Sequence, residues 1–122
     1  MSTEPLIAVI DDDEPSRTAI KEALSVLGYC AHGFASADEF LAAGDECSYD
    51  CIITDIHMPG INGFDLKRRL TARGFATPVI MITARTEPGL EAMAAELGAV
   101  CLLRKPFESD ALTGFLKAAV KI

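Results

Sequence analysis

Short apolar segments alternate strictly with amphipathic segments along this chain, and this alternation restricts the possible folds more than any other feature of the sequence. The apolar segments are each too short to form a lone helix, so we expect strands at residues 6–10, 29–34, 51–54, 79–82 and 99–103. Strands separated by helices are joined by right-handed crossovers, which build a parallel sheet with helices on both faces. The sequence therefore predicts an α/β fold with a doubly wound, five-stranded parallel sheet.

The segments between the predicted strands carry the signals of amphipathic helices. In the first, apolar residues recur at helical spacing and a glycine ends the pattern: Ile20, Ala23, Leu24 and Leu27, then Gly28. Ser36 and Glu39 form a capping box that opens the second helix. The third is expected over 63–73, the fourth around 90–97 and the fifth around 112–119. No linker or repeat interrupts this pattern, so we expect a single domain over residues 1–122.

Charge and hydropathy exclude several classes of protein. The formal net charge is −7, and half of the 122 residues are hydrophobic, which is enough for a core without disulfides or a structural metal. No apolar run approaches the roughly 18 residues of a membrane helix, and the first residues do not resemble a signal peptide. We therefore expect a cytoplasmic protein that binds neither membrane nor nucleic acid, and we interpret the basic residues at 67–73 as a solvated helix face.

The four cysteines do not have the spacing of a zinc site. Cys30, Cys47, Cys51 and Cys101 include no CxxC pair, and the two histidines lie at unrelated spacings. Cys51 and Cys101 fall within predicted strands, where a thiol behaves as a small hydrophobe.

Polar residues follow the predicted strands at the edge where a parallel sheet binds its ligands. Asp11 and Asp12 follow the first strand, Asp55 the third and Thr83 the fourth, and Lys105 comes shortly after the fifth. Carboxylates that converge repel one another unless a cation neutralises them, and Mg²⁺ prefers such oxygen ligands. A metal ion, an ammonium and a hydroxyl beside a positioned carboxylate are also what an aspartate needs to accept a phosphoryl group.

Four segments of the sequence resemble the response-regulator receiver domain of two-component signalling, and the resemblance extends over essentially the whole chain. They are Val9-Ile10-Asp11-Asp12-Asp13-Glu14, Asp55-Ile56-His57-Met58-Pro59-Gly60-Ile61-Asn62-Gly63, Ile82-Thr83-Ala84-Arg85 and Lys105-Pro106-Phe107. Residues 35–41 and 105–108 are most similar to the FixJ-like subgroup. The resemblance implies a flavodoxin-like fold with strand order 2-1-3-4-5. It also implies a regulatory phosphoacceptor that catalyses only its own phosphorylation and slow dephosphorylation.

The resemblance assigns a role to each metal and acceptor residue. Asp55 is the implied phosphoacceptor, and Asp12 and Asp55 would bind Mg²⁺ directly. Asp11 would help directly or through water, and the backbone carbonyl of His57 would be a further ligand. Asp13 falls outside the usual acid pair and is expected to begin the first helix.

The remaining implied roles concern the switch. Thr83 and Lys105 would contact the phosphoryl group, and the peptide bond before Pro106 would be cis. Many receivers have Tyr or Phe where this chain has Leu102, so the resemblance does not imply the usual coupling of threonine to an aromatic ring. His57 and Arg85 occupy positions at which family members tune water access, although both also fit exposed loop residues.

The partners implied are a sensor histidine kinase or a histidine phosphotransfer protein, docked near Ser16, Ala19 and Phe107. A weak homodimer through the fourth helix is expected on phosphorylation, because Ala92 and Ala95 lie among glutamates on its outer side. The sequence fits both a stand-alone receiver and a receiver excised from a longer regulator.

Two functions from other classes fit parts of the sequence. Asp11 and Asp13 after an apolar strand resemble the nucleophile and general acid of a haloacid-dehalogenase-type phosphohydrolase, but Pro15 stands where that pattern has a threonine. A flavodoxin-like binding module would need a phosphate-binding loop after the first strand, where acids stand instead.

Overall fold

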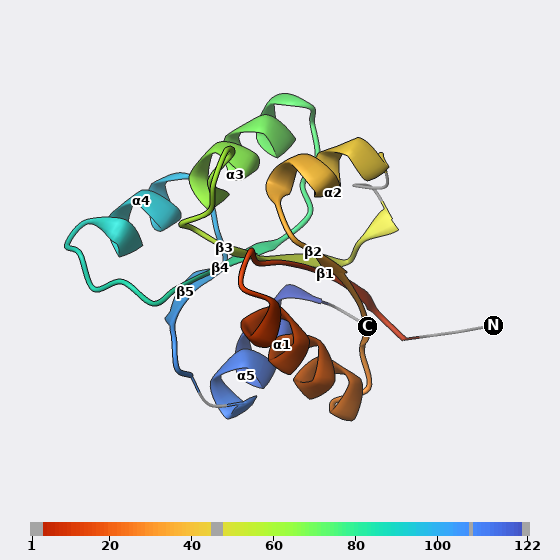
Figure 1. The fold of residues 1–122 in the computed structure, drawn as a ribbon. Helices are drawn as coiled ribbons and strands as arrows, with labels where there is room; N and C mark the ends of the chain where they lie inside the picture. Colours follow the sequence, from red (N-terminus) through yellow and green to blue (C-terminus); the bar gives the residue numbers. More distant parts are fainter. Residues whose placement is uncertain (1–3, 45–47, 108, 121–122) are drawn as a thin grey trace.

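The computed structural model describes residues 4–44, 48–107 and 109–120. Strands and helices alternate along these residues as follows: β1 (Leu6–Ile10), α1 (Glu14–Val26), β2 (Cys30–Phe34), α2 (Ala37–Ala43), β3 (Cys51–Asp55), α3 (Gly63–Ala72), β4 (Val79–Thr83), α4 (Leu90–Glu96), β5 (Cys101–Arg104) and α5 (Ser109–Ala119). The strands form one parallel sheet in the order β2-β1-β3-β4-β5, which confirms the predicted fold and strand order (Figure 1). No described helix is long and apolar enough to cross a bilayer.

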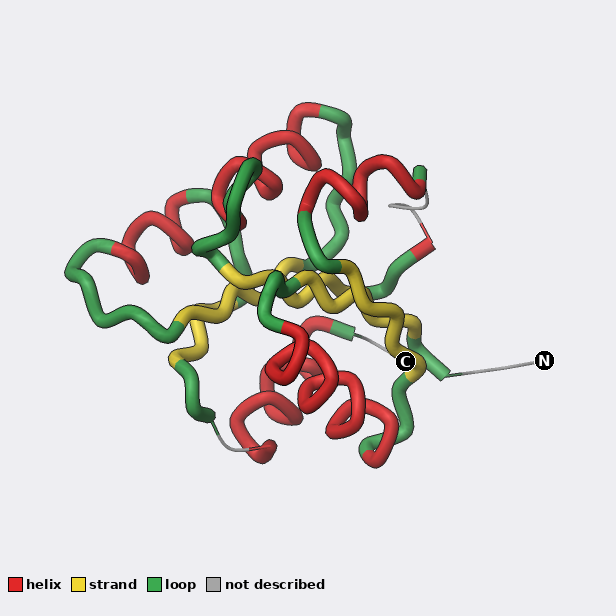
Figure 2. Tube along the Cα trace, viewed as in Figure 1, coloured by secondary structure: helices red, strands yellow, loops and turns green. Residues whose placement is uncertain are grey.

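The sheet separates two hydrophobic cores. Helices α1 and α5 cover one face, and α2, α3 and α4 cover the other (Figures 1 and 2). Alternate residues of β1 serve the two cores, because Ile7 and Val9 pack with α1 and α5 while Ala8 and Ile10 pack against the other three helices. Burial on both faces explains why the three inner strands β1, β3 and β4 read as mainly apolar runs in the sequence.

Side-chain caps begin three of the helices. Asp13 Oδ2 accepts a hydrogen bond from Ser16 N at 3.0 Å, which confirms Asp13 as the residue that begins α1. Ser36 Oγ accepts from Glu39 N at 3.0 Å at the start of α2, as the capping box predicts. Asn62 caps α3 in the same way.

Two strands begin later than the apolar runs predict. Tyr29 N donates to Leu24 O at 2.9 Å and so completes the last turn of α1, and Ala99 N donates to Ala94 O at 3.0 Å and completes that of α4. Both residues still pack against a core, so they extend the apolar run without belonging to the strand. Hydropathy alone does not distinguish these two cases.

Gly63 allows α3 to begin directly above the end of β3. A Cβ atom at this position would lie 2.6 Å from the backbone oxygen of Asp55 and 3.0 Å from Ile56 Cα. We expect Gly63→Ala to lower the free energy of unfolding by about 2 kcal/mol or more, because the clash is with backbone that cannot rotate away. Urea denaturation measures the change.

Gly114 provides the matched control, since nothing lies within 4 Å of a Cβ atom added there in the middle of α5. Gly114→Ala should raise the free energy of unfolding by about 0.5–1 kcal/mol, through helix propensity. A Gly63→Ala protein as stable as the parent would show that the close approach of α3 to β3 is unimportant.

Candidate functional site

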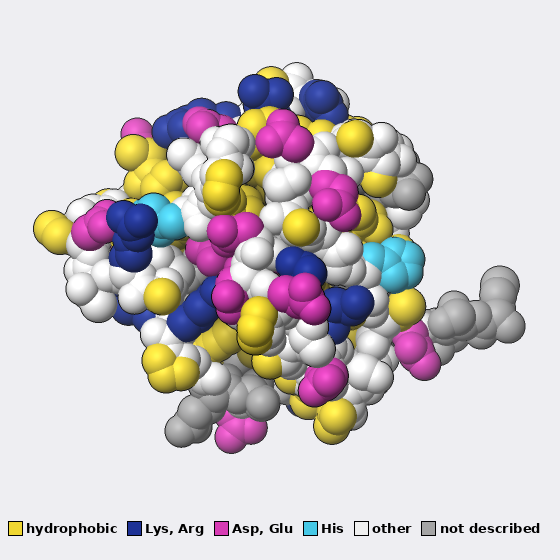
Figure 3. All heavy atoms as spheres, viewed as in Figure 1, with side chains coloured by type: hydrophobic (Ala, Val, Ile, Leu, Met, Phe, Trp, Pro, Cys, Tyr) yellow, Lys and Arg dark blue, Asp and Glu magenta, His cyan; other side chains and the backbone are white. Residues whose placement is uncertain are grey.

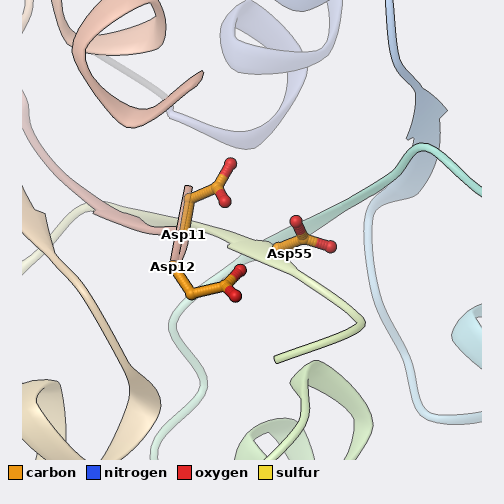
Figure 4. Close-up of side chains that lie close together, drawn as sticks. All are labelled: Asp11, Asp12 and Asp55. Atoms are coloured by element: carbon orange, nitrogen blue, oxygen red, sulfur yellow. The ribbon is translucent and has the colours of Figure 1, made fainter. Parts of the chain in front are cut away.

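The carboxyl edge of the sheet gathers the acidic residues. Asp11 directly follows β1, Asp12 comes next, and Asp55 is the last residue of β3. One carboxylate oxygen from each lies within 4.8 Å of the others (Figure 4). Asp11 and Asp55 are buried, whereas Asp12 is exposed. The predicted cluster of three strand-end aspartates is therefore present.

Lys105 joins this cluster from the segment after β5. Its Nζ lies 2.7 Å from Asp11 Oδ2 and 3.1 Å from Asp55 Oδ2, so one ammonium bridges two carboxylates. The Lys105-Pro106 peptide bond is cis, as the resemblance implies. In Figure 3 acidic and basic side chains lie side by side near the middle of the face shown.

Burial and the neighbouring charges shift the pKa values of both Asp55 and Lys105. Burial raises the pKa of Asp55 and the charge of Asp11 adds to this, while Lys105 opposes both effects without cancelling them. Burial lowers the pKa of Lys105, but the hydrogen bond to Asp11 and the nearby carboxylates outweigh it and leave this pKa raised. A further positive charge near Asp55 would therefore stabilise its ionised form.

Thr83 is the last residue of β4 and is fully buried. Its Oγ1 lies 3.2 Å from His57 Nδ1 and accepts a hydrogen bond from Arg85 N at 3.0 Å. The hydroxyl is thus at the correct strand end but is engaged with the imidazole of His57. The His57 backbone in turn donates to Asp55 Oδ1 at 3.2 Å, which connects the threonine to the acidic cluster.

A cavity of about 420 Å³ opens beside the acidic cluster. It is lined by Asp12, His57, Met58, Pro59, Asn62 and Arg85. Asp12 faces it from the acidic cluster, and His57 and Arg85 border it from the loops after β3 and β4. The cavity is large enough for several water molecules or a small anion.

Asp13 lies outside the acidic cluster, since its carboxylate caps α1. A phosphohydrolase that used Asp13 as general acid is therefore disfavoured. Cys51 is buried in β3 and Cys101 is half-buried in β5, where burial raises the thiol pKa values to about 12 and about 11. Both thiols behave as small hydrophobes, as expected; Cys47 lies outside the described residues.

The basic residues of α3 differ from the expected solvated face at one position. Lys67 is buried, and its Nζ donates to Thr71 Oγ1 at 3.2 Å. Arg68 pairs with Asp65 at 2.8 Å on the exposed side. The prediction was wrong for Lys67 because its long apolar stem can pack inward while its amine bonds within the helix.

Two arginines that sequence reasoning overlooked contact the loops around the site. Arg104, the last residue of β5, donates to the backbone oxygen of Arg85 and lies 3.4 Å from Glu91 of α4. Arg17 of α1 donates to the backbone oxygen of Asp11 at 2.8 Å. Neither contact has a sequence signal, because a carbonyl acceptor carries no residue identity.

The raised pKa of Asp55 has a consequence for stability. A carboxyl group with a higher pKa in the folded than in the unfolded state binds protons more tightly when folded, so the protein loses stability as pH rises through the folded value. Without Mg²⁺ we therefore expect Asp55→Asn to be more stable than the parent at pH 7, with the difference shrinking as the pH falls. Thermal unfolding at pH 7 and at a series of lower pH values tests this.

Glu96→Gln serves as a control because it removes one negative charge from an exposed position on α4. Its stability relative to the parent should change little over the same pH range. If Asp55→Asn behaves like this control, burial at the carboxyl edge does not perturb Asp55.

Known proteins share both the sequence pattern and the fold. Residues 7–117 match the response regulator receiver domain family. The chain is 36% identical over 121 residues to the transcriptional regulatory protein FixJ of Bradyrhizobium diazoefficiens, covering 99% of this chain and 59% of that protein. It is 37% identical over 114 residues to FixJ of Azorhizobium caulinodans, covering 93% of this chain and 54% of that protein.

A solved structure agrees with these relatives. The response regulator receiver protein from Burkholderia phymatum superposes with a TM-score of 0.86 at 39% identity, covering 98% of this chain and 97% of that one. The two FixJ proteins are longer, so this chain spans only a little over half of their length. The family match and the strand-end site together show that the chain belongs to the response regulator receiver domain family, with FixJ-like relatives.

Proposed function

We propose that Asp55 is the residue of this receiver domain that accepts the phosphoryl group. The observation that supports this most directly is the Lys105 ammonium, which bridges Asp55 and Asp11 from a segment far along the chain. Asp55 also occupies the end of β3, the central strand of the sheet, with acidic neighbours on one side and Thr83 on the other. A buried carboxylate between acids and an ammonium suits a nucleophile better than a structural ion pair.

The donor set fits a Mg²⁺ ion. Opposite ligands of an octahedral Mg²⁺ ion are about 4.2 Å apart, and the oxygens of Asp11, Asp12 and Asp55 already lie within 4.8 Å of one another. Asp12 and Asp55 would hold the ion directly, Asp11 directly or through water, and the His57 carbonyl would be a further ligand. When bound, the ion would supply positive charge to the oxygens of the transferring phosphoryl group.

The protein's own residues would divide the reaction as follows. A carboxylate oxygen of Asp55 forms a bond to phosphorus while the bond between phosphorus and the donor's leaving group breaks, which yields an acyl phosphate. Lys105 Nζ and Thr83 Oγ1 bind oxygens of the transferred group. Thr83 must leave His57 to do so, so the transfer would change the contacts of both loops.

The proposed donor is a phosphohistidine on a sensor histidine kinase or a phosphotransfer protein. A mainly apolar cavity of about 470 Å³ next to Lys105 is lined by Ser16, Ala19 and Phe107, among others, and would receive such a partner. We extend the receiver assignment to all of residues 1–122, in a cytoplasmic protein whose only catalysis is its own phosphorylation and slow dephosphorylation. No nucleic-acid or membrane role is proposed for this domain.

Intact-mass measurement after treatment with acetyl phosphate tests the proposal. The parent protein should gain one phosphoryl group with Mg²⁺ and none with EDTA. Steady turnover of a phosphomonoester would instead favour the phosphohydrolase alternative, and a protein that stays unmodified in Mg²⁺ would contradict the proposal.

The surface of α4 and β5 is the proposed output. Ala92 and Ala95 are exposed on α4, and a groove of about 290 Å³ beside them is lined by Val100 and Leu102, among others. Arg104 connects this surface to the loop after Thr83 through its contacts with Arg85 and Glu91. This contact offers a route to α4 that does not need an aromatic ring at position 102.

We expect the protein activated with beryllofluoride to form a weak, reversible homodimer, and Ala95→Arg to abolish it. In a symmetric dimer each protomer would contribute one arginine, so Ala95→Arg would bring two bulky cations together where two alanines otherwise allow close approach. Sedimentation velocity with and without beryllofluoride measures the change.

Ala42→Arg places the same residue on an exposed position of α2, near the opposite edge of the sheet (Figure 1). It should leave the activated dimer unchanged. A strictly monomeric activated parent, or a dimer that tolerates Ala95→Arg, would exclude this surface.

A further inference from the structure

The acidic turn, residues 11–13 after β1, lies beyond the paired part of the sheet. Its backbone groups therefore need other hydrogen-bond partners. Ile10 and Phe34 are the last paired residues of β1 and β2. Beyond them Asp11 N still donates to Phe34 O at 3.1 Å, while Asp11 O accepts from Arg17 Nη1 at 2.8 Å. Since Asp11 is buried, its carbonyl needs a donor. The guanidinium of Arg17 therefore replaces the missing strand partner.

Arg17 contacts this turn at two points, of which one depends on its side chain. The guanidinium binds Asp11 O, whereas the backbone N donates to Asp13 O at 2.9 Å in the first helical hydrogen bond of α1, which any residue except proline would make here. Asp12 lies between Asp11 and Asp13 in the chain, and it is exposed. Within the described part of the chain no hydrogen bond holds the Asp12 carboxylate, so its position depends on the backbone that Arg17 fixes.

Gly33 of β2 provides the path for the arginine. A Cβ atom at Gly33 would lie 3.2 Å from Arg17 Cδ and 3.0 Å from Lys21 Cδ, so the stems of both cations cross the strand where it has no side chain. Lys21 follows the same path one turn further along α1. Of Arg17 and Lys21, only the Arg17 side chain hydrogen-bonds to the acidic turn within the described part of the chain.

We infer that Arg17 is a positioning residue for the magnesium site: it holds the turn of residues 11–13 so that the carboxylates of Asp11 and Asp12 face Asp55. This inference rests on the proposed function, because it concerns the same Mg²⁺ ion. Positioning and simple electrostatics predict opposite results for the loss of Arg17. Removing a cation near three carboxylates strengthens their attraction for Mg²⁺, whereas releasing the turn weakens binding.

Isothermal titration calorimetry with Mg²⁺ alone distinguishes the two effects. Arg17→Met keeps an apolar stem over Gly33 but removes the donor, and we expect about tenfold weaker Mg²⁺ binding. Lys21→Met removes the same charge from the same path, and its affinity should be unchanged or slightly higher. Arg17→Lys, which keeps one donor group, should restore part of the affinity.

Thermal unfolding and phosphorylation kinetics separate positioning from folding. Arg17→Met should require more Mg²⁺ for half-maximal phosphorylation by acetyl phosphate, with nearly the parental rate at saturating Mg²⁺. If Arg17→Met does not fold, the Arg17→Lys protein carries the comparison, with intermediate affinity expected.

Three results would overturn the inference. Parental or tighter Mg²⁺ binding by the Arg17 variants would leave the proposed function intact and refute the positioning role alone. Equal weakening in Arg17→Met and Lys21→Met would point to a general effect of α1. A parent protein that binds no Mg²⁺ at millimolar concentration would refute the metal site itself, and with it the inference.

Discussion

Asp55→Asn should gain no phosphoryl group from acetyl phosphate in the presence of Mg²⁺, whereas the parent gains one. The expected effect is complete loss, because an amide nitrogen or oxygen cannot replace the carboxylate as nucleophile. The other two acids of the cluster are poorly placed to substitute for it. Asp11 is held by Lys105 and by Asp13 N, and Asp12 comes from the exposed turn after β1. Intact mass at equal reaction times measures the loss.

Asp13→Asn is the matched control for this experiment. It makes the same substitution two residues from Asp11, at a helix cap where asparagine is also accepted, and its carboxylate lies outside the acidic cluster. It should be phosphorylated like the parent. Persistent modification of Asp55→Asn under these conditions would move the nucleophile to another residue.

Lys105→Ala should still fold and still bind Mg²⁺, yet fail to change conformation when beryllofluoride mimics the phosphoryl group. Before transfer, Lys105 only offsets acids that a metal ion can offset as well. After transfer, its ammonium would be a direct contact between the segment after β5 and the phosphoryl oxygens. Amide chemical shifts of the loop after β4 and of α4, recorded with and without beryllofluoride, measure the response.

Lys117→Ala controls for the loss of one cation, because Lys117 is exposed in the last turn of α5. This variant should respond to beryllofluoride as the parent does. If Lys105→Ala responds equally well, Lys105 has no role in switching, and the bridge to Asp11 and Asp55 serves only the unmodified protein.

The sequence predicted which polar residues gather at the carboxyl edge because they obey a local rule. Each stands at the end of an apolar run, and in a parallel sheet all such ends meet at one edge. Lys105 thus reaches Asp11 across 94 residues and Asp55 across 50 without any pairing signal between them. The helix caps at Asp13 and Ser36 were predictable for the same reason, since a cap acts within one turn.

The starts of two strands and the burial of one lysine could not be predicted from such local rules. Tyr29 and Ala99 are apolar and packed, but their backbones close helical turns and not strand ladders. The burial of Lys67 was missed because a lysine stem can follow an apolar surface without changing the residue pattern. In both cases backbone or side-chain geometry decided what hydropathy could not.

The sequence by itself determined the α/β alternation and the polar residues that gather at the carboxyl edge of the sheet, because periodicity and strand ends are short-range properties. Only the tertiary structure decided how the long side chains complete the site. His57 meets Thr83, Arg104 reaches the Arg85 carbonyl, and Arg17 reaches the Asp11 carbonyl. The first two contacts join the ends of strands that lie side by side only once the sheet forms, and the third depends on how α1 turns back onto the end of β1. Two of the acceptors are backbone oxygens that every residue carries, so no sequence pattern could have indicated them.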